Sequence, residues 1–139
     1  MQYLKAFIAG FVSTLIFHQG VYGLFWLAGV IPGAPYALSP TWPFGVPAVI
    51  SLAFWGGVWG IPLWLLIRNS AGRRYWLRAT VFGALAPSAV ALFMVFPLKG
   101  LAFAAGWNPV IIIAALILNG AWGFGAALLL RLLRAGVPP

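Results

Sequence analysis

Four apolar stretches dominate this chain, and each is long enough to cross a lipid bilayer. We expect helices near residues 6–30, 46–67, 79–97 and 109–130, because about 20 residues rising 1.5 Å each cross a hydrocarbon core about 30 Å thick. Only 6% of the residues are charged, against roughly 25% in soluble domains. The sequence predicts an all-α membrane protein, with residues 1–139 forming a single integral membrane domain built as a four-helix bundle.

The basic residues between these stretches predict the orientation of the chain. Lys and Arg in short loops are retained on the cytoplasmic side. Only Lys99 falls on the opposite side, so we expect both termini to be cytoplasmic. Because the basic residues form no continuous face, nucleic acid is not an expected partner. The seven residues on the predicted cytoplasmic side are Lys5, Arg68, Arg73, Arg74, Arg78, Arg131 and Arg134.

An internal repeat divides the chain into two tandem hairpins. GVWGIPLWLLIR at residues 57–68 matches GAWGFGAALLLR at 120–131, and KAFIAG at 5–10 resembles RATVFG at 78–83. Both halves begin on the same side of the membrane. The repeat should therefore be parallel, related by an axis along the membrane normal.

Small residues within the repeat predict close helix packing. Glycine and alanine spaced four residues apart let helix backbones approach each other, which drives association inside lipid. Each tryptophan lies nine residues before the Arg that ends its helix, and therefore near the middle of the membrane. We interpret this set as bundle packing, in preference to a ligand site. The packing residues are Gly56, Trp59, Gly60, Gly120, Trp122 and Gly123.

Three polar residues are predicted to form a layer inside the membrane. His18 and Gln19 lie about 20 Å from the cytoplasmic edge, and Asn119 lies about 18 Å from it. An unpaired polar group in hydrocarbon costs several kcal/mol. We therefore expect these side chains to hydrogen-bond across the first and fourth helices and to specify how those helices pair.

Other roles for His18 are limited by the residues available. Zinc and iron sites need three or four protein ligands, and this chain contains one His, no Cys and no acidic residue. We expect no metal site, no resident cofactor and no enzymatic activity, because acid, thiol and paired-histidine chemistry all lack their residues. One histidine could still ligate a haem or chlorophyll, so His18 stays an alternative axial ligand.

The chain contains the motifs FHQG at residues 17–20, PFGVP at 43–47 and FWGGVWG at 54–60. Through these motifs it resembles an uncharacterised family of small bacterial polytopic membrane proteins. The resemblance is best over residues 10–68. It implies location in the bacterial inner membrane, and it transfers no activity and no functional residues.

Two classes of function remain open at this point. The packing motifs and the 17% aromatic content favour a non-catalytic accessory or structural subunit, whose partners would be lipid and other membrane subunits or further copies of the chain. The alternative is a small oligomeric channel or transporter built around the His18, Gln19 and Asn119 layer. The missing carboxylates would suit a neutral or anionic solute.

Overall fold

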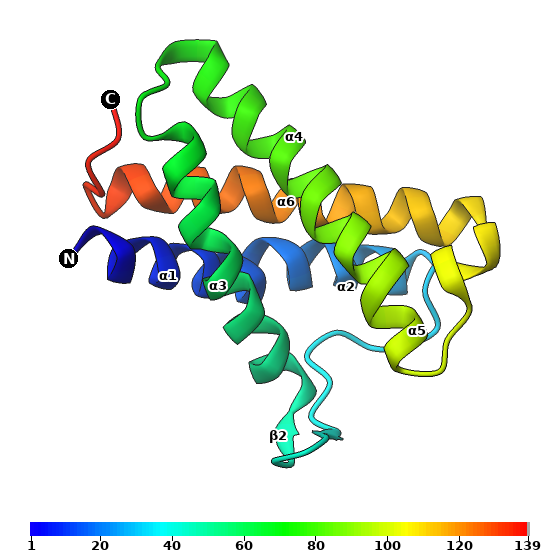
Figure 1. Cartoon of the computed structure of the whole chain (residues 1–139). Helices are drawn as coiled ribbons and strands as arrows, with labels where there is room; N and C mark the ends of the chain where they lie inside the picture. The colour runs from blue at the N-terminus through cyan, green and yellow to red at the C-terminus, as the bar shows by residue number, and fades with distance from the viewer. Residues whose placement is uncertain (139) are drawn as a thin grey trace.

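A computed structural model of the chain, which describes residues 1–138, is built from four long helical spans (Figure 1). All four are long and apolar enough to cross a membrane, and they pack together as a bundle. The prediction of an all-α, multi-pass membrane protein is confirmed. The spans are Gln2–Leu27, Ala48–Ile67, Gly72–Leu98 and Pro109–Leu132.

The first span consists of α1 (Gln2–Ser13), the π-helical segment η1 (Thr14–His18) and α2 (Gln19–Leu27). It ends three residues before the predicted end at residue 30. Gly29 has a φ of +73°, its N–H donates to the Trp26 carbonyl, and the next N–H, of Val30, donates to Phe25. This is a Schellman motif, in which a left-handed residue closes the helix end.

A short hairpin leads into the second span, α3 (Ala48–Ile67). Strands β1 (Pro40–Thr41) and β2 (Val46–Pro47) pair in antiparallel register. Figure 1 shows this hairpin beyond the N-terminal end of α3, away from the other helices. Trp42 and Phe44 lie between the strands and are 93% and 87% exposed. Aromatic rings in such positions favour the membrane interface.

The third span begins earlier than predicted. It contains α4 (Gly72–Val90), the π-helical segment η2 (Ala91–Val95) and α5 (Phe96–Leu98), whereas the apolar pattern placed its start at residue 79. A hydropathy window detects only the apolar residues that fit inside the hydrocarbon core of a bilayer. This helix has 27 residues and is therefore about 40 Å long, which is longer than a hydrocarbon core about 30 Å thick. Its first two turns therefore carry arginines that a hydropathy window excludes.

The fourth span, α6 (Pro109–Leu132), follows the short segment η3 (Phe103–Trp107), which turns with left-handed backbone angles. The Asn108 side chain accepts a hydrogen bond from the Val110 N–H at 3.0 Å. Together with Pro109 in the first turn, this cap fixes the start of α6. The observed bounds lie within two residues of the predicted range 109–130.

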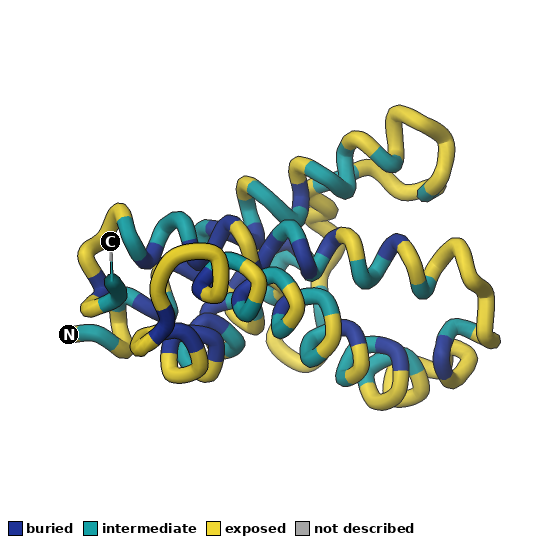
Figure 2. The backbone as a smooth tube through the Cα atoms, turned by 90° about the horizontal axis from the view of Figure 1, so that it is seen from above, coloured by how far each residue is buried: buried dark blue, intermediate teal, exposed yellow. Residues whose placement is uncertain are grey.

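Both termini and the α3–α4 turn lie at the same end of the bundle (Figure 1). In Figure 2, buried positions gather where the helices face one another, while the connecting loops are exposed. Many of the fully buried positions are small, including Ala6, Ala53, Ala79 and Ala126. The core is therefore formed largely by close backbone contact.

Candidate functional site

Glycines form two helix crossings in this molecule. In the first hairpin, a side chain added at Gly10 would strike the Gly56 carbonyl oxygen and the Gly60 Cα. One added at Gly60 would strike the carbonyl oxygen of Ala6. The backbones of α1 and α3 therefore touch, as small-residue spacing predicts.

The second hairpin repeats these contacts position by position. A side chain at Gly83 would strike the Asn119 carbonyl oxygen and the Gly123 Cα, and one at Gly123 would strike the Ala79 carbonyl oxygen. These residues are the partners, under the sequence repeat, of those in the first crossing. The tandem repeat in the sequence is thus also a repeat in the structure, and the α4–α6 crossing is equivalent to the α1–α3 crossing.

The remaining glycine of the predicted packing set lies in a looser environment. A Cβ at Gly120 would be 3.5 Å from the Ala84 Cβ, which is an ordinary contact distance. Gly56, in contrast, faces the Thr14 hydroxyl at a distance that excludes any side chain. The spacing motif located both crossings, but it did not separate Gly120 from the glycines that lie at the point of contact.

The two tryptophans of the repeat link one hairpin to the other. Trp122 on α6 is 3% exposed, and its indole N–H donates to the Gly10 carbonyl on α1 at 2.9 Å. Trp59 on α3 packs edge-on against Phe82 of α4, with ring centroids 5.9 Å apart. Under the repeat, Phe82 stands where the first hairpin has Ala9. The larger ring at this position gives Trp59 an aromatic partner.

Within residues 1–138, the hydrogen bonds predicted between His18 or Gln19 on the first span and Asn119 on the fourth are not made. The Gln19 side-chain oxygen accepts the backbone N–H of Tyr36 at 2.7 Å, and its nitrogen lies 3.4 Å from Nδ1 of His18. Asn119 donates instead to Ser88 on α4, at 3.0 Å.

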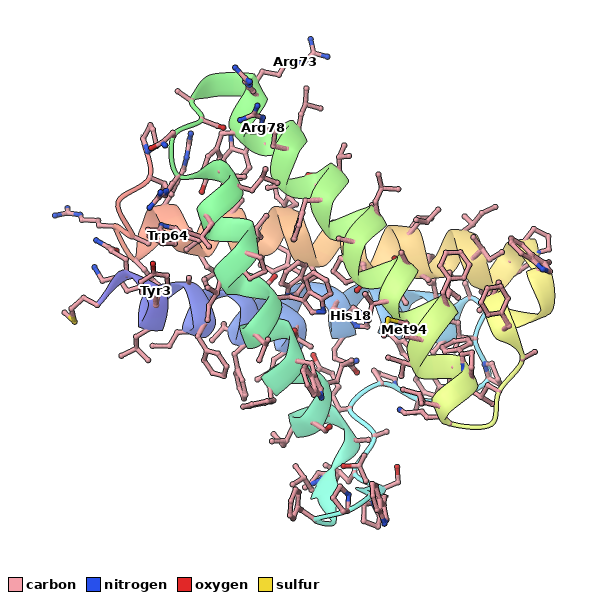
Figure 3. The ribbon with its side chains drawn as sticks, in the orientation of Figure 1. Tyr3, His18, Trp64, Arg73, Arg78 and Met94 are labelled. Atoms are coloured by element: carbon pink, nitrogen blue, oxygen red, sulfur yellow. The ribbon has the colours of Figure 1, made fainter. Side chains whose placement is uncertain are left out.

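The π-helical segment Thr14–His18 explains this difference. A π-helix bonds each residue to the fifth one along the chain and so inserts one residue into the helical ladder. One residue corresponds to a rotation of about 100°, so the faces of α2 cannot be extrapolated from α1. The sequence assigned each residue a depth along its helix, but it did not give the direction of the side chain around the helix axis. His18, near the centre of the molecule in Figure 3, is half-buried.

The pairing of the first and fourth spans depends on residues that the sequence did not single out. Ser13 donates to the Trp122 carbonyl at 2.7 Å, and a side chain at Gly125 would strike the ring of Phe17. Ser13 lies seven residues after Ala6 and thus on the same helix face. That spacing was the available signal, although serine is common enough in membrane helices for it to be easily missed.

A second group, at the end that carries the termini, was also missed. Tyr75 is fully buried and donates to the Ala127 carbonyl at 2.7 Å. The Arg131 guanidinium lies 4.4 Å from the Tyr75 ring centroid and 4.8 Å from that of Trp76. Such cation–π contacts stabilise the Arg131 charge in a chain that contains no acidic side chain. The rings of Tyr3 and Trp64 pack edge-on at the same end of the bundle, with their centroids 5.3 Å apart (Figure 3).

The fold and these contacts define a small multi-pass membrane protein made of two helical hairpins that share one crossing geometry. Comparisons of the chain with models of protein families, with curated proteins and with solved structures find no match.

Proposed function

We propose that this chain is a non-catalytic accessory or structural subunit of a membrane complex, and we assign that complex to the bacterial inner membrane because the FHQG and FWGGVWG motifs resemble those of small bacterial membrane proteins. The backbone contacts at Gly10–Gly60 and Gly83–Gly123 support this proposal. They fill the space between paired helices, and the polar side chains around them bond within the chain. Side chains that are used in this way contribute packing rather than chemistry.

An aromatic ridge, formed by Phe7, Phe11, Phe54 and Trp55, is the surface on which we expect a partner helix. Successive ring centroids along the ridge lie 5.7–6.2 Å apart, and Phe54 and Trp55 are 50% and 58% exposed. Large, rigid aromatic side chains are enriched at protein interfaces.

The repeat indicates that the aromatic ridge is not needed for the fold. The second hairpin makes an equivalent crossing with Thr80, Ala84, Ile117 and Leu118 at the four matching positions. The aromatic residues of the first hairpin are therefore an addition to a packing geometry that forms without them.

The test is extraction at native expression levels in mild detergent, followed by native mass spectrometry. We expect other membrane proteins to accompany the chain at fixed stoichiometry, and Phe54→Ala to weaken that complex by at least tenfold. Ile117→Ala is the matched control, because Ile117 occupies the equivalent position, is 47% exposed and should leave the complex intact. A wild-type chain that appears only as a homo-oligomer would contradict the subunit proposal and favour a channel or transporter.

We also propose that both termini face the cytoplasm. The end that carries the termini and the α3–α4 turn (Figure 1) holds seven of the eight basic residues, which supports this orientation under the positive-inside rule. Reporter fusions at residue 139 and within residues 32–45 should report opposite sides. A periplasmic C-terminus would reverse the topology.

A further inference from the structure

An apolar groove of about 420 Å³ runs between α3 and α4 on the outside of the bundle. Its walls are aliphatic and aromatic, and Arg78 is the one charged residue that lines it. Leu77, Val81 and Leu85 are at least half exposed, so the groove is open to the membrane. The apolar residues that line it are Leu66, Leu77, Val81, Phe82, Leu85 and Ala86.

The two hairpins depart from their common pattern beside this groove. On the other side of the bundle, Gly125 on α6 admits the Phe17 ring and the Ser13 hydroxyl of the first span, which closes that interface. The repeat places Pro62 on α3 where α6 has Gly125, and Ala86 on α4 where α1 has Ser13. A proline ring blocks the close approach that a glycine permits, and alanine supplies no hydrogen bond to draw the helices together.

Positive charge gathers at one end of this groove. Arg78 is half-buried and donates from Nη1 to the Ser70 hydroxyl at 2.9 Å, which leaves its other guanidinium N–H groups free to bind a ligand. Arg73 and Arg74 lie on the preceding turn of α4 and are exposed, and Figure 3 shows Arg73 and Arg78 at the same end of the helix. The chain has no acidic side chain that could pair with them.

The length of the groove matches one leaflet of a bilayer. Arg78 and Ala86 are eight residues apart, which is about 12 Å along a helix. Half of a hydrocarbon core about 30 Å thick is about 15 Å. An acyl chain that lies along the groove would therefore carry its headgroup to the level of Arg78.

We propose that this groove binds an anionic phospholipid, with an acyl chain against Val81, Phe82 and Leu85 and the phosphate at Arg78. A guanidinium binds phosphate oxygens through paired hydrogen bonds, and basic pockets between membrane helices hold anionic headgroups in this way. A partner helix would fit the apolar walls equally well, but it would need an acidic residue at the level of Arg78. The lipid meets both requirements at once, and its binding is independent of the proposed subunit function.

Native mass spectrometry of the full chain in detergent, titrated with dioleoyl phosphatidylglycerol or dioleoyl phosphatidylcholine, tests the proposal. We expect one phosphatidylglycerol molecule to bind about tenfold more tightly than phosphatidylcholine. Arg78→Gln should abolish that preference, and Val81→Phe should weaken the binding of both lipids by filling the groove. Lys99→Gln removes the same charge at the opposite end of the span and should change neither affinity.

Circular dichroism of each variant shows whether it is folded, and Leu85→Phe replaces Val81→Phe if the latter does not fold. Equal binding of the two lipids by the wild-type chain would overturn the proposal. A phosphatidylglycerol preference that survives Arg78→Gln would also overturn it. If the wild-type chain is a dimer that Val81→Phe converts to a monomer, a second copy of the chain occupies the groove and the lipid assignment is wrong.

Discussion

The two hairpins of this protein share a crossing and differ in what surrounds it. Gly10 and Gly60 on one side, and Gly83 and Gly123 on the other, bring the backbones together in the same way. Away from these glycines, α1 packs closely against α6, whereas α3 and α4 leave a groove. A few small residues therefore preserve the geometry of a hairpin, while the residues around them are free to differ.

The outer connections of the hairpins diverge in the same manner. In the first hairpin a polar contact holds the loop, through Gln19 and the backbone N–H of Tyr36. In the second hairpin an aromatic cluster holds it, with Phe93 5.2 Å from Phe103 and 6.4 Å from Trp107 between ring centroids. Equivalent spans can therefore have their outer ends fixed by different physical interactions.

The largest expected effect comes from the glycines at the crossings. Gly10→Ala and Gly83→Ala should each lower the free energy of unfolding by about 3 kcal/mol, because the new methyl group meets backbone atoms that cannot rotate away. Unfolding by sodium dodecyl sulfate in mixed micelles measures both. Gly20→Ala is the control, since its Cβ enters open space, and it should stabilise by at most about 1 kcal/mol. Clearly unequal losses at Gly10 and Gly83 would break the equivalence of the hairpins.

Replacing the two tryptophans sharpens the contrast between the hairpins. Trp122→Phe should cost about 1.5 kcal/mol more than Trp59→Phe, because it removes the hydrogen bond to Gly10 as well as buried area. The same unfolding experiment compares the two variants. An equal cost would mean that the Trp122–Gly10 bond contributes nothing to the joining of the hairpins.

The polar contact in the first hairpin should have a smaller effect. Gln19→Leu should cost about 1 kcal/mol and speed hydrogen exchange at Tyr36, because the Tyr36 N–H loses its acceptor. His18→Leu should cost less, since His18 makes only a long contact with Gln19. The reverse order would show that His18 has a partner of its own. A visible absorption band that disappears in His18→Leu would make His18 an axial ligand.

The smallest expected effect is a stabilisation at the end of α6. Arg134 has a φ of +48° and closes a Schellman motif like those at Gly29 and Gly100, where glycine adopts that conformation freely. Arg134→Gly should stabilise the fold by about 0.5–1 kcal/mol. Lys5 bonds to the Arg134 carbonyl, which the variant keeps. Gly29→Ala should instead lower the free energy of unfolding. A loss of stability in Arg134→Gly would show that the contacts of the arginine side chain outweigh the strain in its backbone.

The four spans, their order and small-residue positions at which helices touch could be predicted from the amino-acid sequence alone. These features depend on the length of each apolar stretch and on the spacing of small residues along one helix. Both can be measured in the sequence without knowing which helix packs against which. Gly60 and Gly123, which that spacing singled out, lie at the points where the helix backbones meet. Hydropathy did not predict the start of α4, because the first turns of this helix are not apolar and are nevertheless helical.

The sequence did not predict which side chains meet around the crossings. The sequence assigned similar depths to Gln19 and Asn119, but depth does not specify rotation about the helix axis, and the π-helical segment at Thr14–His18 changes that rotation. Asn119 consequently bonds to Ser88, and Ser13 bonds to Trp122, a residue 109 positions away in the chain. The groove beside Arg78 is likewise lined by residues of two helices, Leu66 on α3 and Ala86 on α4 among them. Contacts of this kind depend on the mutual orientation of whole helices, which no single stretch of sequence encodes.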